Sequence, residues 1–161
     1  MSEVEDLEEF FASIAANPRF TQRSVSIPGD FRTGWRLSIL CLLLTRGRAN
    51  QLALNHLHVL WWAIRTSSSR TLLLKWLRGD KNPDELIVRF DPSLTVTIDL
   101  AIGQQLVEKT ASGLIKLTSK GGGLADAANS DIEVLVTEKA FLDELPKTIT
   151  QRQISELLEW T

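Results

Sequence analysis

The sequence predicts a mainly α-helical fold with one small β-hairpin, and three observations support this prediction. Apolar residues recur at three- and four-residue spacing in several segments, which is typical of amphipathic helices. Two short apolar runs, Leu106–Thr110 and Leu114–Leu117, flank a three-residue turn that ends in Gly113, which predicts a β-hairpin. Thr118 then stands between this hairpin and a helical pattern over 118–129, where its hydroxyl can cap the helix.

The first 34 residues predict one amphipathic helix followed by a loop. The helix, over 3–16, has a single apolar stripe and ends at Asn17-Pro18. Residues 18–34 contain two prolines and two glycines, and they predict a loop. The stripe consists of Leu7, Phe10, Phe11, Ile14 and Ala15.

The next segment predicts two helices with a short strand between them. Trp35–Thr45 is apolar nearly all round, so we expect this helix to be buried, and Arg46-Gly47-Arg48 ends it. Residues 51–54 favour a short strand. Asn55 is placed to cap a second helix that runs to about Ile64.

Two further elements are expected before residue 91. Thr66–Ser69 predicts a turn, and one of its serines can cap a helix over Ser69–Leu77 that Gly79-Asp80 closes. Glu85–Phe90 predicts a strand.

Two signals compete in the segment before the hairpin. Asp91 at an N-cap and Pro92 at the first helical position start a helix, whereas Leu94–Leu100 alternates with period two, which favours a strand. We predict a helix over 92–105, because the start signal and the length of the run before the hairpin favour it.

The C-terminal residues predict two more amphipathic helices, over 131–143 and 148–160, separated by Pro146, with Thr148 or Thr150 capping the second. The chain therefore divides into an N-terminal amphipathic helix and loop (1–34), a core domain (35–130) and a C-terminal helical extension (131–161).

Composition indicates a soluble, cytoplasmic protein. The chain is 43% hydrophobic, and its one cysteine, Cys41, rules out an internal disulfide framework. The N-terminus is acidic where a signal peptide would be basic. The longest apolar run, Leu37–Leu44, is far shorter than the roughly 18 residues that a membrane span needs.

The net charge of −2 hides a strong segregation along the chain. Residues 1–18 carry five acidic and no basic groups, residues 19–89 have a balance of +8, and residues 90–161 have a balance of −5. Such asymmetry indicates contact with nucleic acid or with acidic protein surfaces. The alternative is that the acidic ends fold back on the basic middle. The candidate contact residues are Arg46, Arg48, Arg65, Arg70, Arg78 and Lys116.

The sequence contains no local motif for catalysis or for metal binding. His56 and His58 lie two apart in a helical pattern and face different sides, so they are better read as structural residues than as metal ligands. In 119–123 the lysine precedes the glycines, unlike the order in a P-loop. We predict a protein that is not an enzyme and has no metal, no cofactor and no small-molecule substrate.

Two tryptophans lie side by side in the basic third of the chain. Leu57, Leu60, Trp61 and Ile64 share one helical stripe, so Trp61 belongs to the core and Trp62 is the candidate for exposure. Tryptophan is enriched at protein interfaces. Trp62, Phe10 and Phe11 are our candidates for contact with a protein partner. The alternative for each is a place in the hydrophobic core.

The order strand, tight turn, strand, Leu-Thr-x-x-Gly and helix over 106–129 resembles the wing of a winged helix-turn-helix domain of the MarR-like kind. In winged helices that read DNA, the helix before the wing presents basic and amide side chains to the major groove. Ser93–Gln105 contains no Arg or Lys, and the wing offers only Lys109 and Lys116. The sequence therefore favours an adaptor over a transcription factor.

The run from Trp35 to Trp160 is also similar to the middle components of bacterial three-component ABC-ATPase anti-phage systems of the Lamassu kind. The segments that carry this similarity are WRLSILCLLLTRGR (35–48), LNHLHVLWWAIRT (54–66), ELIVRFDPSL (85–94), LVEKTASGLIKLTSKG (106–121) and EKAFLDEL (138–145). The resemblance implies a small non-catalytic adaptor subunit in antiviral defence. Its partners would be an SMC-like ABC ATPase and an effector, often a nuclease, with DNA contact inside the complex as an open alternative.

The runner-up hypothesis is a dimeric MarR-like regulator that binds DNA and dimerises through helices in 131–160. Operator binding by the isolated chain would favour the regulator, whereas stable co-purification of an ATPase would favour the adaptor.

Overall fold

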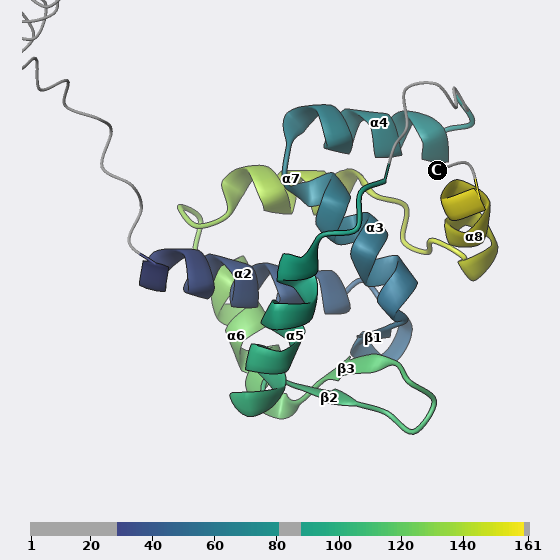
Figure 1. Cartoon of the computed structure of the whole chain (residues 1–161). Helices are drawn as coiled ribbons and strands as arrows, with labels where there is room; N and C mark the ends of the chain where they lie inside the picture. The colour runs from purple at the N-terminus through teal and green to yellow at the C-terminus, as the bar shows by residue number, and fades with distance from the viewer. Residues whose placement is uncertain (1–28, 81–87, 160–161) are drawn as a thin grey trace, which may run out of the picture.

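The computed structural model describes residues 29–80 and 88–159, and within them the fold is mainly helical with a small three-stranded antiparallel sheet (Figure 1). This confirms the predicted mainly helical class with a small β element. The elements are α2 (Gly29–Leu44), the 3₁₀ turn η1 (Arg48–Asn50), β1 (Gln51–Leu52), α3 (Leu54–Ile64), α4 (Ser67–Leu77), α5 (Pro92–Gly103), β2 (Val107–Lys109), β3 (Ile115–Leu117), α6 (Ser119–Ser130), α7 (Val136–Glu144) and α8 (Gln151–Glu159).

Helix α2 lies at the centre of the fold. Its residues Ile39 to Leu44 are almost completely buried, as the continuous apolar run predicts. Helices α3, α5 and α6 pack around α2, and α8 packs on α3 (Figure 1). The C-terminal helices share this core, because Phe141 and Leu142 of α7 and Leu157 of α8 are buried in it.

The sheet has the strand order β1-β3-β2, and both pairs are antiparallel. The predicted hairpin and the short strand after the first core helix are both confirmed. Gly113 has φ +82° in the turn between β2 and β3, a conformation that glycine adopts without steric cost.

The junction between the hairpin and α6 depends on Thr118. Its hydroxyl accepts a hydrogen bond from the Gly121 amide (3.1 Å) and donates one to the Gln105 carbonyl (2.6 Å). The predicted Thr118 cap is therefore confirmed, and it joins the start of α6 to the end of α5. Gly121 packs so closely on this junction that a β-carbon there would lie 2.0 Å from the Leu106 carbonyl oxygen.

The cap of α5 also follows the prediction, whereas two other predicted caps are wrong. The Asp91 carboxylate accepts a hydrogen bond from the Ser93 amide at 2.8 Å, as Asp-Pro predicts. Helix α3 begins at Leu54, so Asn55 lies inside its first turn. The cap of α4 is Thr66 rather than a serine, and the Thr66 hydroxyl accepts a hydrogen bond from the Ser69 amide (3.1 Å).

Three predicted boundaries are also wrong in the described residues. Helix α2 already begins at Gly29, so residues 29–34 are helical rather than part of a loop. A glycine inside a helix costs only about 1 kcal/mol, which the buried apolar turns that follow offset. Residues 88–90 form no strand, and the sheet in the described residues consists of β1, β3 and β2. Helix α7 begins at Val136, because Asp131 accepts from the Glu133 amide in a turn (2.9 Å) and Leu135 is left-handed (φ 55°).

The predicted helix over 3–16 lies outside the described residues, as do residues 85–87 of the predicted strand. Among the described helices, none is both long and apolar enough to cross a membrane.

Candidate functional site

Three of the predicted contact arginines contact an acidic side chain or a carbonyl at the end of a helix. Arg65 pairs with Asp91, and Arg78 lies 3.7 Å from Glu144. Arg70 donates to the Ile64 carbonyl (2.7 Å) at the end of α3. Both carboxylates belong to the acidic C-terminal third, as the fold-back alternative predicts. The side chains of Arg65 and Arg78 are 49% and 70% exposed, so both remain accessible to solvent.

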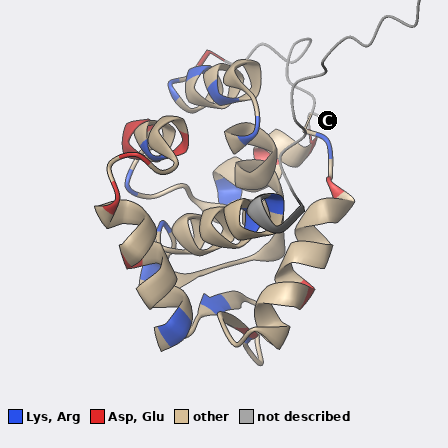
Figure 2. Cartoon of the chain, turned by 90° about the vertical axis from the view of Figure 1, so that its left-hand side faces the viewer, with Lys and Arg blue, Asp and Glu red and all other residues tan. Residues whose placement is uncertain are grey.

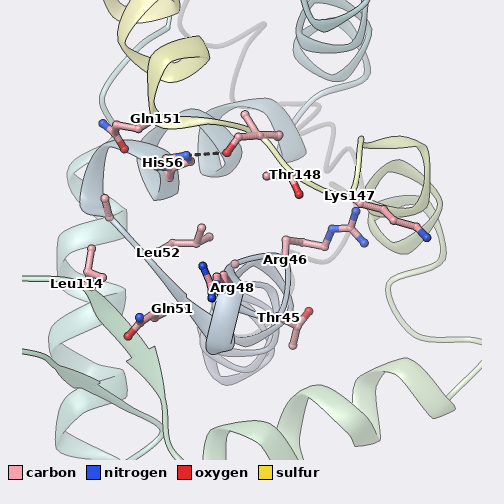
Figure 3. Close-up of a pocket in the computed structure, with 13 residues that line it drawn as sticks. Thr45, Arg46, Arg48, Gln51, Leu52, His56, Leu114, Lys147, Thr148 and Gln151 are labelled. Carbon is pink, nitrogen blue, oxygen red and sulfur yellow. Dashed lines mark hydrogen bonds between the residues drawn. The ribbon is translucent and has the colours of Figure 1, made fainter.

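Arg46 and Arg48 instead line a pocket of about 540 Å³, together with a third cation, Lys147 (Figure 3). The pocket lies where the end of α2, η1 and β1 meet the start of α3 and the connector 145–150 between α7 and α8. None of its lining residues is acidic. The remaining lining residues are Thr45, Gly47, Gln51, Leu52, Ala53, His56, Leu114, Thr148, Ile149 and Gln151.

Two side chains hold the connector in place over the pocket. Arg46 donates from Nη2 to the carbonyls of Leu145 (3.3 Å) and Pro146 (3.4 Å). His56 Nε2 lies 3.2 Å from the Ile149 carbonyl oxygen, which can only accept, so this nitrogen carries the proton (Figure 3). The pocket wall is therefore tied to both α2 and α3.

His56 is only 8% exposed, and its Nδ1 makes no hydrogen bond among the described residues. Burial lowers the pKa of His56, partly opposed by the Ile149 carbonyl and by the Gln151 amide beside the ring. Burial also lowers the pKa of His58, whose ring packs edge-on against Phe90 with centroids 4.6 Å apart. Both imidazoles are therefore neutral at pH 7.

Lowering the pH from about 7.5 to about 5.5 is expected to lower the free energy of unfolding through these two histidines. Below the unfolded-state histidine pKa of about 6.5, the two imidazoles bind protons in the unfolded chain, whereas in the folded chain they stay neutral to a lower pH. Stability is therefore lost as the pH falls from about 6.5 towards the folded pKa, by at most about 1.4 kcal/mol per pH unit for each histidine. The difference between the urea unfolding midpoints at the two pH values should be smaller in a His56→Gln/His58→Gln variant than in the parent chain. An undiminished pH dependence in that variant would contradict the assignment.

Lys116 does not join the pocket. It lies on β3 opposite Glu108 of β2, with Nζ 3.7 Å from the carboxylate, and this pair is exposed. The hairpin therefore presents a neutralised pair rather than a free cation at this position.

Helix α5 presents an apolar outward face. Val96 is 63% exposed, Leu100 39% and Ile102 41%, and Phe90 just before the helix is 55% exposed. Asp99 is exposed on the same helix, and α5 contains no Arg or Lys. Figure 2 shows this helix at the lower right, with acidic but no basic residues. Val96 and Leu100 are four apart and share one side of α5, and we call these two residues the α5 apolar face.

The two tryptophans differ in the way the sequence predicts. Trp61 is 1% exposed, whereas Trp62 is half-buried and packs against the core with part of its ring accessible. Phe10 and Phe11 lie outside the described residues. Whether Trp62 contacts a partner remains a prediction.

No metal centre is formed in residues 29–80 and 88–159, because no three His, Cys, Asp or Glu side chains there are placed to share an ion. Burial raises the pKa of the Cys41 thiol to about 11, so the thiolate that would act as ligand or nucleophile is scarce at neutral pH.

Sequence reasoning missed Lys147 and the α5 apolar face. Lys147 lies about a hundred positions from Arg46 and Arg48, so its place beside them depends on tertiary contacts that the sequence does not show. The apolar face could have been found from Val96 and Leu100, which are four apart and so share one face of the predicted helix.

Comparison with known protein families, with characterised proteins and with solved structures finds no match for this chain.

Proposed function

We propose that this chain is a winged helix-turn-helix adaptor that docks on a protein partner through the α5 apolar face. The observation that carries the proposal is the outward surface of α5, the helix that directly precedes the hairpin. In a DNA-reading winged helix this surface would be basic, and here it is apolar with one exposed carboxylate, Asp99.

The order of elements supports the winged-helix assignment. Helix α2, strand β1, helix α3, helix α5 and the β2–β3 hairpin follow one another as first helix, strand, helix pair and wing. Helix α4 is an addition between the two members of the pair, so that residues 65–91 replace a turn that normally has three or four residues. Arg65–Asp91 and the hydrogen bond from Trp61 Nε1 to the Ser93 hydroxyl (3.4 Å) hold the pair together.

The energetics of the α5 apolar face favour a protein over duplex DNA. Full burial of a large apolar side chain is worth about 1.5–3 kcal/mol relative to full exposure, and Val96 (63% exposed) and Leu100 (39% exposed) can gain part of it in a protein contact. Duplex affinity comes mainly from neutralised phosphates, and Asp99 repels them. A face of this kind fits the apolar centre of a protein interface.

An adaptor needs a second surface, and the connector between α6 and α7 offers one. Ile132 is 85% exposed, and Val134 and Val136 are also exposed. The sequence resemblance implies an SMC-like ABC ATPase and an effector such as a nuclease as the two partners of such a subunit. We propose that the α5 apolar face contacts the ATPase and the Ile132–Val136 segment contacts the effector.

The regulator alternative needs helices in 131–160 as a dimerisation arm. Phe141, Leu142, Ile154 and Leu157 of these helices are instead buried in their own chain. We therefore do not propose it.

The test is co-expression of the chain with its genomic neighbours, followed by affinity purification and mass spectrometry. Val96→Asp/Leu100→Asp should reduce the co-purified ATPase more than about tenfold, because substitutions at the centre of an interface cost about 2 kcal/mol or more. Ile132→Asp/Val134→Asp is the control, since it places the same two charges on other exposed apolar residues and should leave the ATPase bound. Undiminished ATPase in the α5 variant, or specific operator binding by the isolated chain, would refute the adaptor proposal.

A further inference from the structure

We propose that the pocket lined by Arg46, Arg48 and Lys147 binds a phosphate group carried by a ligand of nucleotide size. This inference is independent of the adaptor proposal, because it uses none of the α5 apolar face.

The charge of the pocket points to an anion. Three cationic residues line it, Arg46 in the turn after α2, Arg48 in η1 and Lys147 in the connector between α7 and α8, and no lining residue is acidic (Figure 3). Neither Arg48 nor Lys147 forms an ion pair with any residue in the described parts of the chain. A pocket lined by cations without a counter-charge attracts an anion.

The backbone adds donors to the same site. The N-cap of α3 is Ala53, which has no side-chain oxygen to accept from the first amides of the helix, and Ala53 and His56 both line the pocket. Uncapped amides and the positive end of the helix dipole favour a negative group. Gln51 and Thr148 contribute further polar side chains to the lining.

Hydrogen bonds also fix the wall of the pocket. His56, which is more than nine-tenths buried, holds the Ile149 carbonyl, and Arg46 holds the carbonyls of Leu145 and Pro146. These contacts fix the backbone of the connector that carries Lys147. A pocket of about 540 Å³ falls within the range of about 300–1,000 Å³ that is usual for small-molecule sites.

Guanidinium groups match the geometry of phosphate, and Arg–phosphate contacts are among the stronger hydrogen bonds in proteins. A nucleotide and the backbone of a nucleic acid share this chemistry, and the experiment separates them. Leu52 and Leu114 give the pocket an apolar side against which a base or sugar can lie.

The test is isothermal titration calorimetry on the full chain with four probes: inorganic phosphate, ATP, a DNA oligonucleotide and a glutamate-rich peptide. Arg48→Ala/Lys147→Ala removes two exposed cations and leaves Arg46 and His56 to hold the connector. Arg78→Ala/Arg152→Ala is the matched control, since it lowers the net charge equally, outside the pocket. Circular dichroism melts of both variants check that they fold.

We expect ATP to bind saturably and inorganic phosphate to bind more weakly. The affinity for ATP should fall about tenfold for each cation removed, which corresponds to about 1.4 kcal/mol each. The control should bind as the parent chain does. Binding of the oligonucleotide alone, with the same dependence on Arg48 and Lys147, would assign the phosphate to a nucleic-acid backbone.

Three results would overturn the proposal: no binding of any phosphate-bearing probe, equal loss in the control variant, or binding of the acidic peptide alone. The last would assign the pocket to carboxylates.

Discussion

Trp61→Ala is expected to lower the free energy of unfolding by about 4 kcal/mol, the middle of the range for removing a buried large aromatic side chain. Trp61 packs edge-on against Trp35 of α2, with ring centroids 6.3 Å apart at 63°. Its Nε1 donates to the Ser93 hydroxyl at the start of α5 (3.4 Å). The substitution therefore leaves a cavity where three helices meet and removes a hydrogen bond between two of them.

Trp62→Ala is the matched control, because it removes the same side chain from the next position. Trp62 is half-buried, so we expect a loss of about 1–2 kcal/mol. Urea unfolding followed by circular dichroism measures both variants. Equal losses would show that the burial assigned to the two tryptophans is wrong.

Gly121→Ala is expected to destabilise the chain by about 3 kcal/mol, the upper part of the usual range for overpacking. The added β-carbon would lie 2.0 Å from the Leu106 carbonyl oxygen and 2.8 Å from Leu117 Cδ2. The carbonyl is backbone that also accepts the Thr118 amide (3.1 Å), so it cannot withdraw without disturbing the junction between the hairpin and α6.

The neighbouring glycines give this prediction its control. A β-carbon at Gly122 or Gly123 meets no atom within 4 Å. Alanine at either position should stabilise the chain by about 0.5–1 kcal/mol, because glycine in a helix costs about that much. Thermal and urea unfolding should therefore show a lower free energy of unfolding for Gly121→Ala and a higher one for the other two variants. Stabilisation by Gly121→Ala would contradict the close approach of α6 to Leu106.

Elements with a local start signal could be predicted from the sequence. The buried residues of α5 are Leu94, Thr97, Ile98 and Ala101, which have helical spacing, although Leu94–Leu100 alternates in the sequence. The Asp91 cap, a local interaction, therefore identified the element correctly where the hydrophobic pattern was ambiguous. Thr118 worked in the same way for α6.

Features that depend on long-range packing were missed. The start of α2 could not be predicted, because glycines near it are typical of loops. The cost of these glycines is offset by the packing of α2 against α5 and α6, which the sequence does not show. The pocket was only half predicted, since Arg46 and Arg48 were candidates but Lys147 joins them through contacts of the connector with His56 and Arg46.

The strand order has a consequence for the sequence of folding events. Strands β2 and β3 are joined by a tight turn and can pair within microseconds, whereas β1 pairs with β3 across more than sixty intervening residues. Closing that long loop has a larger entropic cost, so Leu52 can join Ile115 only after α2, α3 and α5 have brought the two strands together. The sheet is thus completed late in folding, and the phosphate pocket, which contains Gln51 and Leu114, forms at the same late step.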